Sequence, residues 1–404
     1  MSPGLDTNGV TADHDFDNHL NLRILGIGVE YPPYQLRAPD LDTLAARYYP
    51  SSPALSKVLQ INQFTGINTR SSIGSIDHPI ANQPNAPSIA DLCKIFLKDG
   101  VALSVAACRK AIEEWGGDIN DITHVVSTTC TNSANPGFDH FVTKELGIGS
   151  EVDKVLLHGV GCSGGLAVLR TASNLALGMS FRKKPARVLV LACEISSVLV
   201  RSELDSIVQN QEVGIGVTLF SDCASAMVLS NGIGDDFNGS TPLFELLGWK
   251  HKILEDSAQD LGFDVDPLGW KVVLTPRVPE LAAASVEPML KDLISSIPGK
   301  AKYIGSKTAR DYDWALHPGG LTIITGIEAE MGLTSAHLRA SYDVYVNHGN
   351  SSSATIFSVI NRLREMSEGR KEVVACAFGP GISVEMMMLR RLVGVGTPPT
   401  EIDM

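Results

Sequence analysis

Residues 158–176 read HGVGCSGGLAVLRTASNLA, and this stretch places a cysteine where an apolar strand turns through glycines into a helix. Apolar positions 166, 169, 172/173 and 176 repeat at helical spacing, so we expect the helix over Leu166–Leu177 to pack inward. Cys162 could simply be a small apolar side chain in a tight turn. At a helix N-terminus, however, free backbone N–H groups and the helix dipole favour a thiolate and lower the thiol pKa. The stretch therefore makes Cys162 a candidate nucleophile.

Two further turns, WALHPGG at 314–320 and VNHGNSSSATI at 346–356, show the same pattern of a short apolar strand followed by small residues that open a helix. His317 could form an ion pair with a cysteine and later donate a hydrogen bond to an oxyanion. Asn350 would add a donor that cannot take up a proton. Alternatively, His317 is a hydrogen-bonded core histidine and Asn350 a helix N-cap. Together with Cys162, the three side chains suit carbon–carbon bond formation on thioesters, where an enolate must be stabilised without a metal.

Short β-rich runs alternate with longer helical patterns along the chain, which is typical of layered α/β proteins. The predicted strands are Leu22–Val29, His124–Thr129, Val155–His158, Arg187–Ala192, Ala224–Ser230, Trp314–Leu316, Val344–Asn347 and Val373–Phe378. The predicted helices are Ile89–Trp115 with a break near Gly100, Gly137–Leu146, Leu166–Leu177, Ala282–Ser296, Thr322–Met331 and Ser353–Met366.

A Gly/Asn/Asp-rich stretch, Asn231–Pro242, marks a boundary between two halves that each carry a reactive residue at a turn. We therefore expect an N-terminal half over 22–235 with the nucleophilic cysteine, and a C-terminal half over 236–392 with His317 and Asn350. The polar segment 1–21 is expected to be a disordered lead-in, and 393–404 a flexible tail.

Composition excludes several classes of function. The chain has 404 residues, 44% of them hydrophobic, and a net charge of −12, which disfavours nucleic acid and anionic membrane surfaces as partners. No apolar run is long enough to span a membrane, and no secretory leader is evident. The seven cysteines are odd in number and form no C-x-x-C pair, which opposes a disulfide framework or a zinc site. We expect a cytoplasmic protein with free thiols.

The motifs GCSGG, HPGG, GNSSSA and FGPG (Phe378–Gly381) resemble the signatures of type III polyketide synthases, the chalcone-synthase superfamily, and are most similar to fungal members. The resemblance implies an α/β fold of thiolase type, with five αβαβα layers and two pseudo-repeated halves. It also implies a homodimeric acyltransferase that uses acyl-CoA and malonyl-CoA and needs no cofactor. By the same resemblance, Cys162 is the nucleophile, and His317 and Asn350 are the decarboxylation pair.

The resemblance further implies a set of substrate-binding residues. Phe220 matches a gatekeeper phenylalanine, Asn135 a turn that closes the cavity of the neighbouring subunit, and Lys57 a contact to the CoA phosphates. Two other basic CoA positions are Gln60 and Phe64 here, which departs from the plant enzymes. The cavity positions are Cys130, Leu199, Gly216, Val272 and Ser352, and the motif loops add Gly319, Gly320, Phe378 and Gly381.

Two cavity positions differ from those of plant chalcone synthases and indicate which kind of acyl-CoA starter the pocket accepts. Val272 stands where plant chalcone synthases have a second gatekeeper phenylalanine, and Leu199 where they have a threonine. A wider, more apolar wall favours a flexible alkyl chain over a phenolic ring, whose hydroxyl would be left unpaired. We therefore expect a medium- to long-chain fatty acyl-CoA starter and an alkylpyrone, alkylresorcinol or alkylresorcylic acid product.

Three other classes of protein share part of this pattern. A ketoacyl synthase III-type enzyme shares Cys, His and Asn but takes malonyl from an acyl carrier protein, and HPGG and FGPG oppose it. A papain-like protease would need a separate CGSCW motif, which the chain lacks. A non-catalytic acyl-CoA-binding protein would be expected to have lost at least one of the three site residues.

Overall fold

The computed structural model describes residues 20–393 except 236–240, 267–268, 298–306 and 367–368. The lead-in predicted over 1–21 and the tail predicted over 393–404 lie outside the described residues, apart from 20, 21 and 393. No helix in the described part of the chain is long and apolar enough to cross a membrane.

The strands are β1 (Leu22–Glu30), β2 (Tyr34–Leu36), β3 (Arg70–Ser72), β4 (His124–Thr128), β5 (Asp153–Leu157), β6 (Arg187–Ile195), β7 (Asp222–Ser230), β8 (Phe244–Ile253), β9 (Leu261–Asp266), β10 (Gly269–Leu274), β11 (Asp313–Leu316), β12 (Glu372–Gly379) and β13 (Ser383–Arg391). The α-helices are α1 (Ala38–Tyr48), α2 (Pro53–Asn62), α3 (Ile89–Ile95), α4 (Val101–Trp115), α5 (Phe138–Leu146), α6 (Gly164–Phe181), α7 (Val200–Asn210), α8 (Gly216–Leu219), α9 (Val278–Ser296), α11 (Leu321–Glu330), α12 (Arg339–His348) and α13 (Thr355–Glu365).

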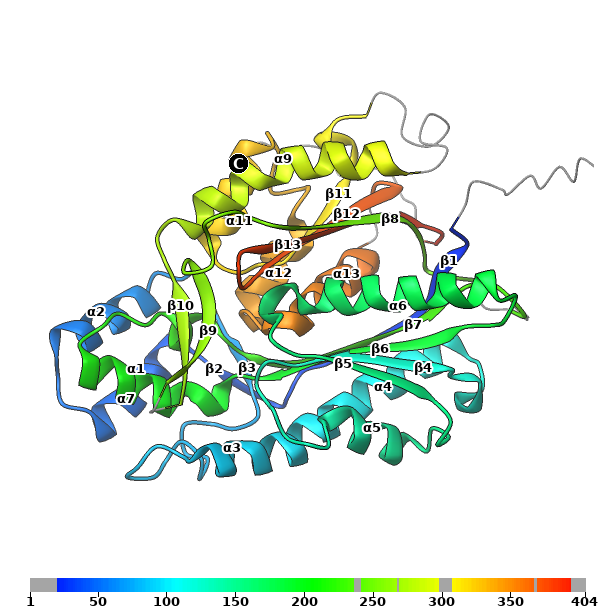
Figure 1. Ribbon diagram of the computed structural model, residues 1–404. Coiled ribbons are helices and arrows are strands. Elements are labelled where there is room, and N and C mark those ends of the chain that lie inside the picture. The colour runs from blue at the N-terminus through cyan, green and yellow to red at the C-terminus, as the bar shows by residue number, and fades with distance from the viewer. Residues whose placement is uncertain (1–19, 236–240, 267–268, 298–306, 367–368, 394–404) are drawn as a thin grey trace, which may run out of the picture.

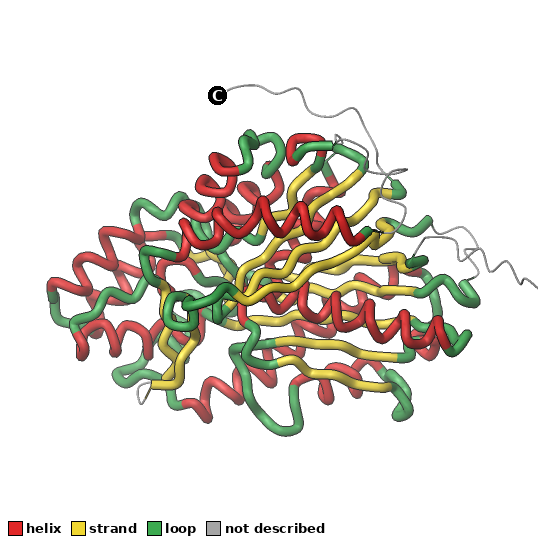
Figure 2. The backbone as a smooth tube through the Cα atoms, turned by 45° about the horizontal axis from the view of Figure 1, so that its top comes forward, coloured by secondary structure: helices red, strands yellow, loops and turns green. Residues whose placement is uncertain are grey.

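Among the described residues, nine strands form one sheet in the order β11-β12-β13-β8-β1-β7-β6-β4-β5. Figure 1 shows this sheet folded over the central helices α6 and α13, with α9 and α11 above and α3, α4 and α5 below. The result is the five-layered αβαβα arrangement of the thiolase fold, as predicted. Figure 2 shows the strands of both halves as one fan, with the β9–β10 hairpin standing apart beside α7.

Three apolar clusters hold the layers together. The first lies around α6 and α13 and contains Leu166, Leu169 and Ile356, all fully buried. The second lies beneath α9 and α11, and the third between α4 and the strands β4, β6 and β7. The predicted apolar stripe of α6 therefore does pack inward, because Ala172, Ser173 and Ala176 are also fully buried.

One predicted strand is wrong. Val344–Asn347 lies in helix α12, not in a strand, so Asn350 follows a helix whereas His317 follows strand β11. Val344 and Tyr345 are buried together with Ala340 and Ser341, which is the spacing of one helix face. The predicted break near Gly100 is a π-helical turn over Phe96–Gly100 between α3 and α4.

Helices α1, α2 and α7 gather at one side of the layers, next to the β9–β10 hairpin (Figure 1). Their apolar faces form a separate cluster that includes Leu41, Leu44, Val58 and Leu204. Strand β3 pairs with β2, and Arg70 on β3 donates to Asn62 at the end of α2.

Candidate active site

The cysteine turn lies at the start of α6, and its glycines are required by close contacts. Gly161 has a φ of +56°, and a Cβ there would lie 2.7 Å from Cδ of Pro380. A Cβ on Gly165 would lie 2.5 Å from the backbone oxygen of Ser353. The turn therefore packs directly against the FGPG loop on one side and the GNSSSA loop on the other.

The Asn350 side chain joins two of the predicted motifs. Its Nδ2 donates to the backbone oxygen of Gly319 at 3.2 Å, and its Oδ1 accepts from the backbone N–H of Ser352 at 2.8 Å. The bond to Ser352 closes the turn before the 3-10 segment Ser352–Ala354. Asn350 is not the helix N-cap of the alternative interpretation, because the N-cap residue of α13 is Ala354. A hydrogen bond from Asn350 also lowers the pKa of the Cys162 thiol, so the same side chain reaches the cysteine.

His317 is buried, with 1% of its surface exposed, at the end of strand β11. Its backbone N–H donates to the oxygen of Cys376 at 2.8 Å, which continues the β11–β12 pairing. Neither Nδ1 nor Nε2 has a hydrogen-bond partner among the described residues. A purely structural buried histidine would be expected to have such partners, so the imidazole is available to a ligand.

Burial sets the protonation of both groups. It raises the pKa of Cys162 to about 11, with a further increase from the charge of Glu194 and decreases from hydrogen bonds with Ser352 and Asn350. Burial also lowers the pKa of His317 to about 3. The expected low thiol pKa is therefore not found in this structure, because desolvation outweighs the helix terminus. The unliganded site holds a neutral thiol and a neutral imidazole.

A buried carboxyl group connects the loops that surround Cys162. Glu194, fully buried in β6, accepts hydrogen bonds from Oγ of Ser353 at 2.6 Å, from Oγ1 of Thr131 at 2.8 Å and from the backbone N–H of Cys130. These hydrogen bonds link the loop at Cys130 to the loop at Ser353, and the cysteine turn packs against the second loop. The thiol of Cys162 in turn donates to Oγ of Ser352 at 3.4 Å.

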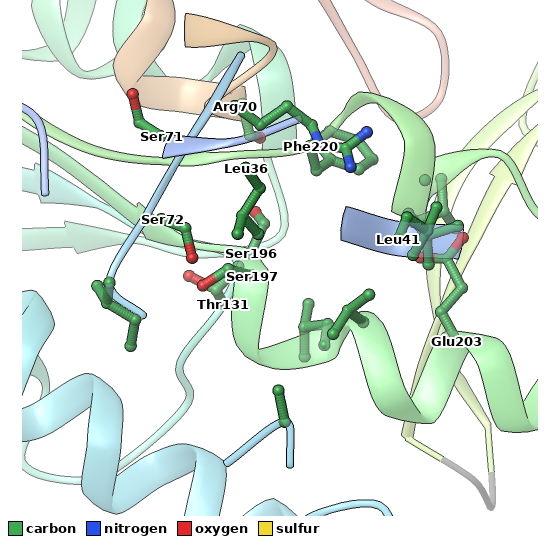
Figure 3. A pocket seen from close by; sticks show the side chains of 18 of the residues that line it. Leu36, Leu41, Arg70, Ser71, Ser72, Thr131, Ser196, Ser197, Glu203 and Phe220 are labelled. Carbon is green, nitrogen blue, oxygen red and sulfur yellow. The ribbon is translucent and has the colours of Figure 1, made fainter. Parts of the chain in front are cut away.

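Cys162 lines a pocket whose wall also includes Leu41 of α1 and Glu203 of α7. Figure 3 shows Leu41 and Glu203 together at one side of this pocket. The predicted residues that line it are Cys130, Cys162, Leu199, Gly216, Phe220, Val272 and Ser352. The structure does not place His317, Asn350, Gly319, Gly320, Phe378 or Gly381 on the pocket wall, although the neighbouring Pro380 is there. Lys57 is exposed on α2, and Asn135 is exposed in the loop between β4 and α5.

Several pocket residues escaped the sequence analysis. Leu36, Leu41, Leu44 and Arg70 come from the N-terminal part of the chain, and Glu203 from α7. The sequence did contain one sign of Glu203. It lies three residues after Val200 and four residues before Ile207, and this spacing places all three on one face of a helix. A glutamate on the apolar face of a helix is a buried polar group, and such a group points to a function more strongly than an exposed apolar residue does.

The remaining candidate metal ligands and cysteines form neither a metal site nor a disulfide in the described part of the chain. No group of three or more His, Cys, Asp or Glu side chains is arranged to hold a metal ion there. All seven cysteines are free thiols, and four of them, Cys108, Cys193, Cys223 and Cys376, are buried.

Comparison with known proteins identifies the family. Residues 70–233 match the model of the N-terminal domain of chalcone and stilbene synthases, and residues 245–393 match that of the C-terminal domain. A type III polyketide synthase of Penicillium soppii is 43% identical over 92% of this chain and 96% of its own length.

Solved structures of type III polyketide synthases are similar to this chain in both sequence and fold. A type III pentaketide synthase from Neurospora crassa is 57% identical, with a TM-score of 0.88 over 92% of this chain and 100% of that one. CsyB, an acylalkylpyrone synthase of Aspergillus oryzae solved in complex with CoA, is 38% identical, with a TM-score of 0.89 over 92% of this chain and 100% of that one. The chain therefore belongs to the chalcone and stilbene synthases, among the type III polyketide synthases, which are transferases.

Proposed function

We propose that this enzyme repeatedly condenses malonyl-CoA with a medium- to long-chain fatty acyl group held on Cys162, and cyclises the product to an alkylpyrone, alkylresorcinol or alkylresorcylic acid. The observation that carries the proposal is the buried His317, whose two ring nitrogens lack partners among the described residues. A Cβ on Gly319 would lie 3.8 Å from Nε2 of His317, and the Gly319 backbone oxygen accepts from Asn350, which also hydrogen-bonds Cys162. These nitrogens fit the thioester oxygen of a substrate.

The first step loads the starter. The thiol proton of Cys162 passes to His317 while the sulfur attacks the acyl-CoA carbonyl carbon. The carbon–sulfur bond to CoA then breaks, and His317 returns the proton to the leaving CoA thiolate. Burial disfavours a lone thiolate and a lone imidazolium, as the two pKa values show. A proton that moves from one group to the other creates both charges in the same site, where their attraction offsets part of that cost.

The second step extends the chain. His317 and Asn350 donate hydrogen bonds to the thioester oxygen of malonyl-CoA, the bond to the carboxylate breaks, and carbon dioxide leaves. The electron pair stays on the enolate, whose carbon attacks the Cys162 thioester and expels the thiolate. Backbone N–H groups around Cys162 and the Phe378–Gly381 loop serve as the oxyanion hole. The steps draw only on CoA thioesters and use no metal or organic cofactor.

The pocket supports an alkyl starter. Its wall combines Leu199 and Val272 with Leu36, Leu41 and Leu44 from the α1 region. Each methylene group buried against such a wall contributes about 0.8 kcal/mol, so several additional carbons change affinity by orders of magnitude. The relative named as an acylalkylpyrone synthase and solved with CoA has the same fold, which agrees with a CoA-linked acyl substrate.

We further propose that the enzyme is a cytoplasmic homodimer. Strand β5 forms the edge of the large sheet, and Leu156 on it is 36% exposed. An open edge strand with an exposed apolar side chain is a surface that another chain can cover. A Cβ on Gly137 would lie 2.4 Å from Leu156, so the Asn135 turn adjoins this edge, as expected for a turn that meets the neighbouring subunit.

The deciding experiment incubates the protein with malonyl-CoA and acyl-CoA starters of increasing length, without a carrier protein, and identifies products by mass spectrometry. We expect alkyl products from the wild type, and neither product nor acyl-enzyme from Cys162→Ala. Cys130→Ala is the matched control, because this thiol lines the same pocket and should leave acylation intact. Extension only from a malonyl-loaded carrier protein would indicate a ketoacyl synthase III-type enzyme, and p-coumaroyl-CoA outcompeting every fatty starter would refute the alkyl pocket.

A further inference from the structure

A carboxyl group with no assigned role lines the same pocket. Glu203 lies in α7 and is 7% exposed, and its Oε1 has no hydrogen-bond partner in the described part of the chain. Leaving such an oxygen unpaired in a protein interior carries a desolvation cost that no hydrogen bond offsets. A polar atom with that cost, facing a substrate pocket, needs a partner that the polypeptide does not provide.

The carboxyl of Glu203 lies between the backbone of α8 and the side chain of Val272. A Cβ on Gly216 would lie 2.6 and 2.7 Å from its two oxygens and 2.8 Å from Cγ2 of Val272, so the glycine leaves the space that the carboxyl occupies. The backbone N–H groups of Gly216 and Val217 act on the carboxyl and lower its pKa, but burial has the larger effect and raises it to about 7.

Figure 3 shows where this carboxyl lies relative to the rest of the pocket. Glu203 extends from α7 towards Leu41 on α1, whereas the hydroxyl groups of Ser72, Ser196 and Thr131 gather on the other side. Arg70, the labelled cation of the pocket, is engaged with Asn62 and the backbone of Thr218 instead. Glu203 thus presents a hydrogen-bonding group in the part of the pocket that Leu41 and Val272 make apolar.

We infer that Glu203 is a specificity-determining residue that hydrogen-bonds a hydroxyl group, alcohol or enol, on the acyl chain bound in this pocket. The inference rests on the proposed function only in taking the ligand to be an acyl chain. A hydroxyl both donates and accepts, so it satisfies Oε1 whether the carboxyl is ionised or protonated, whereas a carbonyl serves only the protonated form. An anionic group would be repelled by the ionised form.

Two sources can supply this hydroxyl, and separate assays distinguish them. The first source is a hydroxylated starter, tested by binding in a Cys162→Ala background, where no acyl-enzyme can form. The probes are lauroyl-CoA and lauroyl-CoA carrying one hydroxyl at carbon 6, 8, 10 or 12. We expect at least one hydroxylated probe to bind about tenfold more tightly than lauroyl-CoA, and Glu203→Leu to abolish that preference without weakening lauroyl-CoA.

The second source is the enol of a chain that has already been extended. It is tested by turnover of lauroyl-CoA with malonyl-CoA in the otherwise wild-type enzyme. Here Glu203→Leu should shift products to fewer extensions while the rate of Cys162 acylation stays within about twofold. Glu203→Gln, which keeps an acceptor and a donor at the same length, should retain much of the wild-type pattern. Glu287→Gln, at an exposed position of α9, is the matched control.

The outcomes separate the sources and the two proposals. A hydroxyl preference that Glu203→Leu removes assigns the group to the starter, and a change in extension number alone assigns it to the growing chain. Neither effect, with a melting temperature that falls in Glu203→Leu and recovers in Glu203→Gln, would overturn the inference and leave Glu203 a structural residue. The binding assay needs no turnover, so it keeps its meaning even if Cys162 proves not to be the nucleophile.

Discussion

Replacing Gly165 with alanine tests whether contact between the cysteine helix and the Asn350 loop sets the geometry of the site. A Cβ at this position would lie 2.5 Å from the backbone oxygen of Ser353 and 2.5 Å from Cγ2 of Ile356. Ordinary contact begins near 3.4 Å, so α6 and the loop must separate by about 0.9 Å. Backbone atoms supply one of the two clashes, and they cannot rotate away.

The expected loss is larger for activity than for stability. Overpacking of this kind costs about 1–3 kcal/mol, which lowers the melting temperature by only a few degrees in a large domain. A shift of nearly 1 Å between Cys162 and Asn350, however, costs on the order of 100-fold in rate, because the reacting groups are no longer aligned. We therefore expect a folded protein with severely reduced condensation.

The assay measures the steady-state rate of condensation of lauroyl-CoA with malonyl-CoA, together with thermal unfolding. Gly178→Ala is the matched control, because it lies in the same helix and nothing lies within 4 Å of the added Cβ. That control should be fully active and more stable by up to about 1 kcal/mol, since alanine is the better helix former. If Gly165→Ala matched wild-type activity within twofold, the contact would not control the site.

Four other substitutions test the remaining assignments. Asn350→Ala should slow malonyl-CoA decarboxylation about 100- to 1,000-fold yet still allow acylation of Cys162, whereas His317→Ala should lose both; equal acylation defects would assign Asn350 the wrong role. Val272→Phe should shorten the longest acyl chain accepted, judged from product masses, while short starters are acylated as before. Leu156→Asp, at the β5 edge, should yield monomers by sedimentation, whereas a wild type that is itself monomeric and fully active at micromolar concentration would contradict the dimer.

The sequence was most informative where a local pattern and a tertiary contact agree. GCSGG is such a case, because Gly164 and Gly165 are both helix-initiating residues and points where the GNSSSA loop approaches too closely for a Cβ. The same agreement holds for strands in which every residue is buried, such as β6 over Arg187–Ile195. The layered fold and the meeting of Cys162 with Asn350 could be predicted for this reason.

Other features depend on neighbours that no local pattern reveals. Val344 and Val346 favour a strand by their β-branching, but packing of Val344 and Tyr345 on one face makes α12 a helix. The expected low pKa of Cys162 is not found because the helix terminus is visible in the sequence, whereas the desolvation of the thiol by the surrounding protein is not. The pocket residues Leu36 and Leu41 belong to a segment with no motif, and only the fold brings them near Phe220.

The place of β1 in the middle of the sheet has a consequence for biosynthesis. Leu22 pairs with Leu246, and Arg23 with Ser230, so this early strand has both neighbours in a distant part of the chain. At about 5–20 residues per second, a ribosome needs roughly 10–40 s to make the intervening residues. Throughout that time the apolar segment LRILGIGVE has neither partner strand, and it is therefore a segment that a chaperone must shield or a neighbouring nascent chain can capture.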